Sequence, residues 1–328
     1  MIRKASFSLQ SVAWFSLCLL VLSISSCAER AAYRHLEVAV GLERHRESDQ
    51  ALAAYQAAAE AAPADAYVVR QLGRAYLRRQ MYAKAETVLL KALELEPAYV
   101  AVFRDLALAA EAQDKSDAAL AWLQRGVREV PQYAPLHQDL VDYHDYRDRP
   151  DRALELLREA EERWPRAAWV HQRLGRLYAQ LRWYDRAEAS LRKSLAIDPG
   201  SAPSYALLGD SLYEQEKYTE AIQAYRDAIA RDPHDHSSLN NLAWVFATQG
   251  THLEEGLRLS RRSLRLAPDS AAYLDTMAEL HYRQGNLPKA IEIIQYAISL
   301  QSGDDNPKML QHLRNQLRKF QAAGLGNA

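Results

Sequence analysis

The sequence predicts an all-α fold, a solenoid of stacked antiparallel helix pairs. Prolines recur at one constant spacing, the step from Pro63 to Pro97, and small and large apolar residues recur at fixed offsets before them. A period in this range indicates a repeat array and not one globular core. No apolar–polar alternation of period two competes with it, so almost no strand is expected. The prolines are Pro63, Pro97, Pro131, Pro165, Pro199 and Pro233, with Pro268 one residue late.

The segment before each proline is predicted to be a helix with one closely packed face. A small residue lies twelve positions before the proline, a large apolar residue follows four positions later, and a second small residue comes three positions after that. These offsets share one helical face, where small side chains let a neighbouring helix approach. The proline ends the helix, because it lacks an amide hydrogen and disfavours helical geometry in the preceding residue. The three sets are Ala51, Ala85, Ala119, Ala153, Ala187 and Ala221; Tyr55, Leu89, Leu123, Leu157, Leu191 and Tyr225; and Ala58, Ala92, Gly126, Ala160, Ser194 and Ala228.

The first half of each repeat has its own stripe, in which a large apolar residue is followed directly by glycine or alanine. The small residue again permits a tight helix contact. Two antiparallel helices joined by a short polar turn, such as residues 79–81, satisfy both stripes. The copies are Leu72–Gly73, Leu174–Gly175 and Leu208–Gly209, with Leu106–Ala107 and Met277–Ala278 as weaker ones.

These residues resemble the tetratricopeptide repeat (TPR) family. Its pattern is matched nearly throughout by LGRAYLRRQMYAKAETVLLKALELEP and LGDSLYEQEKYTEAIQAYRDAIARDP. The resemblance covers residues 32–304 as eight repeats and implies a right-handed TPR superhelix, an α-solenoid. A helix over residues 305–320 is expected to cap the last repeat, and residues 321–328 are expected to form a flexible tail. The repeats are 32–65, 66–99, 100–133, 134–167, 168–201, 202–235, 236–270 and 271–304.

Residues 1–26 are predicted to be a secretory signal peptide. Arg3 and Lys4 precede an apolar stretch over residues 12–24, which is too short to span a bilayer as a helix. The stretch ends in Ile24-Ser25-Ser26-Cys27, which resembles the lipobox of bacterial lipoproteins. This resemblance implies cleavage before Cys27, acylation of Cys27 with palmitate-like chains, and a short linker over 27–31. The alternative is an ordinary cleavage site that a cysteine happens to follow.

The predicted location is the cell envelope, as an outer-membrane lipoprotein that faces the periplasm. Two or more acyl chains anchor a protein stably, and the N-terminal lipid is the only membrane contact expected. Ala28 follows the cysteine, and by resemblance to enterobacterial lipoproteins the lack of Asp there favours the outer membrane. Without residues 1–26 the chain holds 39 basic and 42 acidic residues, because only Arg3 and Lys4 are lost. Nucleic-acid binders usually carry a strong basic excess, so no nucleic-acid partner is expected.

The family resemblance also implies a binding face. In TPR proteins the first helices of successive repeats line a concave groove, and residues one turn apart share the exposed face of each helix. Basic residues dominate the groove face of the early repeats, and acidic residues dominate that of repeats six and eight. This difference in charge would orient an extended polypeptide. Aromatic residues would serve as anchors. The alternative is that the Arg and Asp side chains pair with each other across neighbouring helices and that the aromatic residues pack between repeats. The predicted groove residues are Tyr67, Arg70, Arg74, Arg78, Arg104, Gln138, Asp142, Asp145, Tyr146, Trp169, Gln172, Arg173, Arg176, Asp210, Tyr213, Glu214, Asn240, Asn241, Trp244, Asp275, Glu279 and Tyr282.

No catalytic constellation is apparent in the sequence. His234-Asp235-His236 is the best metal-like cluster, but further ligands are missing nearby, and we interpret it as a loop that caps the next helix. No nucleophile-elbow, zincin or phosphate-cradling glycine motif is found. We therefore expect no enzymatic activity, no metal and no cofactor.

The predicted function is that of a lipid-anchored envelope scaffold or adaptor. It would bind a protein or peptide partner in the groove and support the assembly or regulation of a cell-envelope, pilus or export machine. The alternative is a glycan-binding protein of an exopolysaccharide system, since grooves lined by Tyr and Trp can stack sugars and the chain has 18 Tyr and 6 Trp. Self-assembly through the terminal elements is a third option, and the oligomeric state stays open.

Overall fold

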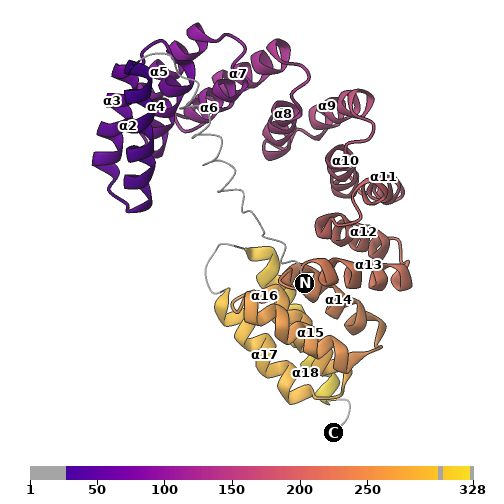
Figure 1. Cartoon of the computed structure of the whole chain (residues 1–328). Helices are drawn as coiled ribbons and strands as arrows, with labels where there is room; N and C mark the ends of the chain where they lie inside the picture. Colours follow the sequence, from indigo (N-terminus) through magenta and orange to yellow (C-terminus); the bar gives the residue numbers. More distant parts are fainter. Residues whose placement is uncertain (1–26, 302–305, 326–328) are drawn as a thin grey trace, which may run out of the picture. The chain divides into compact units, whose positions relative to one another are not determined.

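A computed structural model describes residues 27–301 and 306–325, which form seventeen α-helices and contain no strand (Figure 1). Sixteen of the helices form eight consecutive pairs, as the repeat pattern predicts. The predicted signal peptide, residues 1–26, lies outside the described residues. The first helices of the pairs are α2 (Cys27–Arg44), α4 (Ala66–Arg78), α6 (Val100–Glu111), α8 (Ala134–Tyr146), α10 (Ala168–Gln180), α12 (Ala202–Glu214), α14 (His236–Gln249) and α16 (Ala271–Arg283). The second helices are α3 (Ser48–Ala61), α5 (Tyr82–Leu95), α7 (Ser116–Glu129), α9 (Pro150–Arg163), α11 (Tyr184–Ile197), α13 (Tyr218–Arg231), α15 (Leu253–Leu266) and α17 (Leu287–Leu300).

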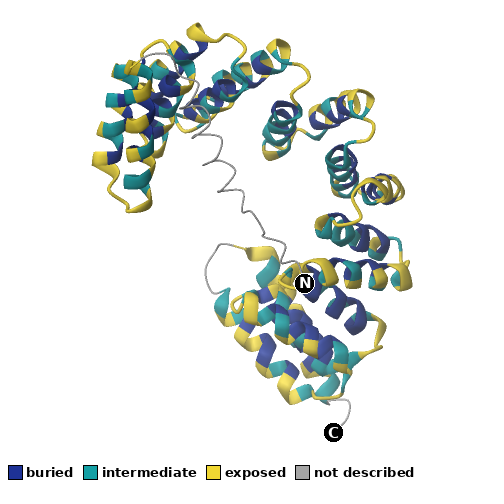
Figure 2. Cartoon of the chain, in the orientation of Figure 1, coloured by how far each residue is buried: buried dark blue, intermediate teal, exposed yellow. Residues whose placement is uncertain are grey.

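The chain divides into two compact units between Leu156 and Leu157, inside α9. In the N-terminal unit a continuous buried core runs from Ala32 on α2 to Leu140 on α8. In the C-terminal unit two buried clusters extend from Leu191 on α11 to Phe320 near the chain end. Buried residues lie where the helices of each unit face one another (Figure 2).

Each of several helix pairs is held by a small residue on the first helix that meets a large one on the second. A Cβ added at Gly175 would lie 2.5 Å from Leu191, and one at Gly209 would lie 2.7 Å from the Tyr225 ring. The small residue that precedes each large one by four positions is buried as well, from Ala51 to Ala221. The prediction that small residues allow close helix contacts and that large residues fill the space between the helices is therefore confirmed.

The turn inside each repeat places one residue in the left-handed backbone region. Gln80 has φ of 57° and Glu216 has φ of 60°. The amide of the next residue bonds back to the first helix, as from Met81 to the Tyr76 carbonyl at 2.9 Å. This geometry favours glycine, and repeats seven and eight have Gly250 and Gly285 there, whereas the other repeats place a larger residue. The larger residues in the remaining repeats are Arg46, Asp114, Asp148 and Arg182, and in repeat seven His252 occupies the same region in addition to Gly250.

The ends of the array differ from the predicted boundaries. Helix α2 begins at Cys27, inside the range expected to be a linker, because residues 28–32 are rich in alanine and Glu29 favours a helix N-terminus. The capping helix α18 spans Pro307–Leu325, so it starts later than expected and continues through much of the expected tail. Ala322 and Ala323 are strong helix formers and extend it. Residues 326–328 lie outside the described residues.

Helix α18 covers the apolar end of repeat eight, as the sequence predicts. Leu313 and Phe320 are fully buried in one cluster with Ile294 and Ala297 of α17. The Phe320 ring stacks on the Tyr282 ring of α16 with the centroids 4.9 Å apart. Asn306 caps the helix, since its side chain accepts a hydrogen bond from the Met309 amide at 3.0 Å.

Candidate partner-binding surface

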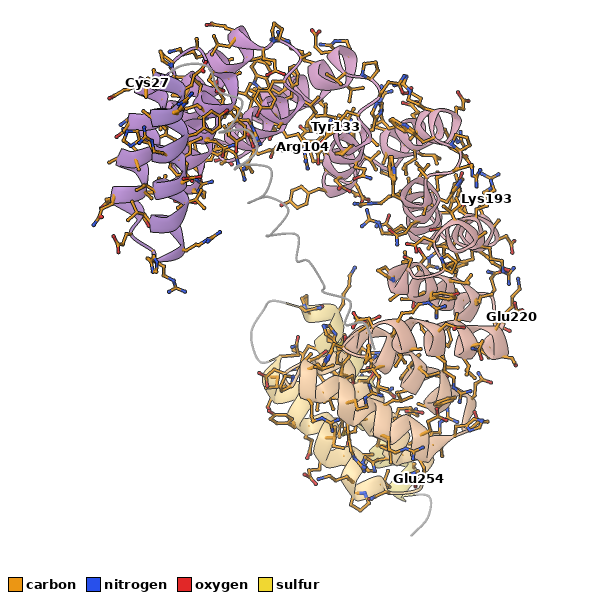
Figure 3. All side chains as sticks on the ribbon, viewed as in Figure 1. Cys27, Arg104, Tyr133, Lys193, Glu220 and Glu254 are labelled. Carbon is orange, nitrogen blue, oxygen red and sulfur yellow. The ribbon has the colours of Figure 1, made fainter. Side chains whose placement is uncertain are left out.

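An open depression in the N-terminal unit is lined by three consecutive first helices, α4, α6 and α8. Corresponding positions of successive repeats contribute to it, because one repeat length separates Arg70 from Arg104 and Arg74 from Leu108. The side chains along the chain, with Arg104 labelled, are drawn in Figure 3. The lining residues are Arg70, Arg74, Ala101, Arg104, Asp105, Leu108 and Asp139.

Two of the three arginines in this depression are neutralised by the next repeat. Arg70 Nε donates to Asp105 Oδ2 at 2.6 Å, and these side chains are only 15% and 13% exposed. Arg104 binds Asp139 with two donors, one of them Nη2 to Oδ1 at 2.9 Å. The hydrogen bond to Asp139 raises the pKa of Arg104. These pairs hold the guanidinium groups in place and reduce the positive charge predicted for the early groove.

The predicted groove residues at the start of the array are also engaged within it. Arg78 bonds Glu43 at 2.5 Å, and its guanidinium lies over the Tyr55 ring, 5.4 Å from the centroid. Tyr67 is partly exposed and stacks in parallel on Tyr33, with ring centroids 6.1 Å apart. Burial, followed by the nearby Glu43 charge, raises the pKa of Tyr55 to about 12.

Arg74 differs from these arginines. Its side chain is exposed, and no ion-pair partner for it is found among the residues that the structure describes. Beside it on the next first helix lies Leu108, an apolar side chain that is 57% exposed. Sequence reasoning missed Leu108, although the repeat pattern points to it, since it occupies the position in α6 that Arg74 occupies in α4.

On α8, the predicted residue Asp142 is half-buried, and Tyr146 follows it by one turn. The Tyr146 side chain is 90% exposed, more than any other large aromatic residue among those described as exposed. Aromatic side chains dominate the free energy of many protein interfaces, so this tyrosine is a strong candidate for contact with a partner.

In the C-terminal unit the predicted residues form pairs across neighbouring first helices. Asp210 accepts a hydrogen bond from Asn241 Nδ2 at 3.0 Å and another from the Tyr225 hydroxyl at 2.7 Å. The indole of Trp244 donates to the Tyr213 hydroxyl at 2.9 Å. Burial raises the pKa of Asp210, and the two donors oppose that rise. These polar atoms therefore already have partners inside the array.

On α10, Trp169 lies against Trp164, with ring centroids 6.1 Å apart. Arg173 and Arg176 are half-buried on the same helix, each with an interaction of its own.

Asp275 and Glu279 do not lie on an open face, contrary to the predicted groove. They are 6% and 2% exposed, because α18 packs beside α16 and places the side chains of His312 and Lys319 against them. His312 Nε2 is 2.8 Å from Asp275 Oδ2, and Lys319 Nζ is 2.5 Å from Glu279 Oε2. The sequence pattern of repeat eight placed these two carboxylates on the groove face, but it did not reveal that α18 covers them.

The loop before α14 has the capping geometry expected from its sequence. The Asp235 side chain accepts hydrogen bonds from the amides of Ser237 and Ser238, and His236 Nδ1 lies 2.6 Å from the Tyr273 hydroxyl. In the described ranges, no group of three or more His, Cys, Asp or Glu side chains could hold a metal ion.

Cys27, the predicted lipidation site, is an exposed free cysteine at the first position of α2. None of the helices described is both long enough and apolar enough to cross a bilayer.

Helix pairs of constant repeat length and a shared first-helix surface define a repeat scaffold, a class that uses extended surfaces for binding. Tetratricopeptide repeat family models match residues 39–98, 70–134 and 207–271, and a second such model matches residues 147–210. Since these matches cover most of the array, the chain belongs to the tetratricopeptide repeat family.

Solved structures share this fold at low sequence identity. One is the crystal structure of the APC/C hetero-tetramer Cut9–Hcn1, with 14% identity over 95% of this chain and 60% of that chain, and a TM-score of 0.60. Another is PilF of Pseudomonas aeruginosa, with 22% identity over 65% of this chain and 97% of that chain, and a TM-score of 0.54. At these identities the likeness shows the fold alone. A comparison with curated protein sequences finds no match.

Proposed function

We propose that this protein is a scaffold or adaptor that binds a protein or peptide partner on the surface formed by its first helices. The observation that carries this proposal is the depression of the N-terminal unit, which three first helices line and to which Arg74 and the exposed Leu108 contribute. Tyr146 adds a nearly fully exposed aromatic ring on α8 of the same unit. An apolar side chain, an aromatic ring and an arginine are residue types that protein interfaces favour.

A glycan-binding role receives less support from the two tryptophans predicted for the groove. Sugar stacking needs an open ring face, whereas Trp244 is half-buried and bonded to Tyr213. Trp169 is also half-buried and lies against Trp164. We therefore favour a polypeptide as the partner.

The test is site-specific photocrosslinking in the cells that produce the protein. Benzoylphenylalanine replaces Tyr146 on a first helix or, as the matched control, Tyr296 on the second helix α17, which is 51% exposed. We expect a discrete protein adduct from position 146 and none from position 296. Equal adducts from both positions would contradict the proposal. A response of tryptophan fluorescence to oligosaccharides, with no protein adduct, would favour the glycan-binding role instead.

We further propose that the scaffold is anchored in the cell envelope through lipid on Cys27 and works with an envelope, pilus or export machine. The support is the basic start, the short apolar stretch and the Ile24-Ser25-Ser26-Cys27 sequence. Labelling of cells with an alkyne analogue of palmitate should mark the wild-type chain and not the Cys27→Ser variant. A wild-type chain without label would rule out the lipid anchor and leave the binding role standing.

A further inference from the structure

We infer that Arg74 and Leu108 form a subsite for an acidic residue and an apolar residue of one extended partner segment. This inference rests on the proposed function and names the chemistry that the groove recognises. Its basis is the difference between Arg74 and the other arginines of the depression, together with the exposed leucine beside it.

The charge of the depression favours a carboxylate. Three arginines and two aspartates line it, and the aspartates are bound to Arg70 and Arg104. The remaining positive charge belongs to Arg74. Its guanidinium can donate two parallel hydrogen bonds to a carboxylate, a geometry that lysine cannot provide. Because Arg70 and Arg104 are paired with aspartates, Arg74 is the charge in the depression that disfavours a cation at this place in the partner.

Leu108 supplies the apolar half of the subsite. It projects from the exposed face of α6 among polar neighbours, where its side chain keeps more than half of its surface in water. Covering this surface with an apolar partner side chain is favourable in proportion to the area removed from water. Ala101, on the same helix and lining the same depression, leaves room for that side chain.

The spacing of the two helices sets the spacing in the partner. Arg74 and Leu108 occupy equivalent positions of α4 and α6, which are in contact, and helices in contact lie about 8–10 Å apart. In a strand, residues two positions apart share a face and are separated by roughly 7 Å. In a polyproline II segment, residues three positions apart share a face and are separated by roughly 9 Å. The subsite therefore fits an acidic and an apolar residue two or three positions apart.

The test uses the full chain and a set of fluorescein-labelled peptides. Each peptide carries one glutamate and one leucine, one to five positions apart, in an alanine and serine background. Fluorescence anisotropy should show the tightest binding at spacings of two and three. Replacing the glutamate of the peptide by glutamine should weaken its binding to the wild-type chain by about five- to tenfold. The same change in the peptide should leave its affinity for the Arg74→Gln variant unchanged.

Matched variants separate the subsite from general effects. Leu108→Ser should weaken all leucine-containing peptides about tenfold. Arg74→Lys, which keeps the charge but loses the two-pronged geometry, should bind with intermediate affinity. The controls Arg265→Gln and Leu266→Ser alter exposed residues of α15 in the other unit and should bind as the wild type does.

Absence of a spacing preference, or equal losses in the α15 controls, would overturn the subsite. A partner that crosslinks to position 146 equally well in the wild type, Arg74→Gln and Leu108→Ser would also overturn it. In that case the proposed adaptor function would stand.

Discussion

Gly73 on α4 lies so close to Leu89 on α5 that a Cβ added at Gly73 would come within 2.6 Å of the leucine Cδ2. The same contact between a glycine and a large side chain recurs in later repeats, as Gly175 with Leu191 and as Gly209 with Tyr225. The absence of a side chain at one position thus sets the separation of the two helices in each of these repeats.

Gly73→Ala should therefore destabilise the protein, although alanine is the better helix former. The added methyl group forces Leu89 from its place, at a cost of about 1–3 kcal/mol. Gly41→Ala is the matched control, because no atom lies within 4 Å of the position where its Cβ would be. The control should stabilise α2 by roughly 0.5–1 kcal/mol. Urea denaturation measures both, and equal effects of the two substitutions would refute this packing role.

Gln80→Gly should stabilise the turn between α4 and α5. Gln80 has φ of 57°, a left-handed conformation that costs a residue with a side chain about 1–2 kcal/mol relative to glycine. Part of this gain is lost because glycine is more flexible in the unfolded chain, which leaves roughly 0.5–1 kcal/mol. The reverse change, Gly285→Ala at φ of 78°, should destabilise by a similar amount. Thermal denaturation that shows the opposite order of the two variants would contradict the assignment of strain to these turns.

Asp210→Asn should reduce the pH dependence of stability. Burial raises the pKa of Asp210, so the folded chain holds this proton at pH values where the unfolded chain, with a pKa near about 3.9, has lost it. The free energy of unfolding therefore falls as pH rises from about 4 through the raised pKa. Asparagine cannot ionise and keeps an oxygen to accept from Tyr225.

The control for this prediction is Asp185→Asn, which changes an exposed carboxylate in the same unit. Urea denaturation at several pH values gives the slope of the free energy of unfolding against pH. This slope should equal the wild-type value in the control and be smaller in Asp210→Asn. Some slope should remain, because burial also raises the pKa of Asp275. An unchanged slope in Asp210→Asn would show that Asp210 ionises alike in both states.

Phe320→Ala should loosen the C-terminal end of the array and leave the N-terminal unit unaffected. Phe320 is fully buried against Tyr282, and its truncation should cost about 3–5 kcal/mol. Repeats contact mainly their neighbours, so the loss should stay local. Hydrogen exchange should quicken in α16 to α18 and stay constant in α4 to α6, and Lys308→Ala should change neither. Faster exchange throughout the chain would contradict this local effect.

The amino-acid sequence by itself determined the fold class and nearly all helices. A repeat depends on contacts within one pair and with the next, so the information lies within a short stretch and recurs in every repeat. Buried positions such as Ala85, Leu89 and Ala92 could be assigned from offsets alone. The ends were harder, since the repeat pattern stops there and local helix propensity decides where α2 begins and where α18 ends.

Only the tertiary structure decided which groove side chains are available to a partner. Arg70 meets Asp105 of the next first helix, and Arg104 meets Asp139 in the same way, whereas Ala109 stands at the corresponding position after Arg74; the structure shows that these aspartates are within bonding distance. Asp275 and Glu279 belong to the same helix face as the other predicted residues, but α18 covers them with His312 and Lys319. The ion pairs and the covering contacts form between helices that are distant in sequence. For that reason the repeat pattern located the binding surface but not the side chains on it that are accessible to a partner.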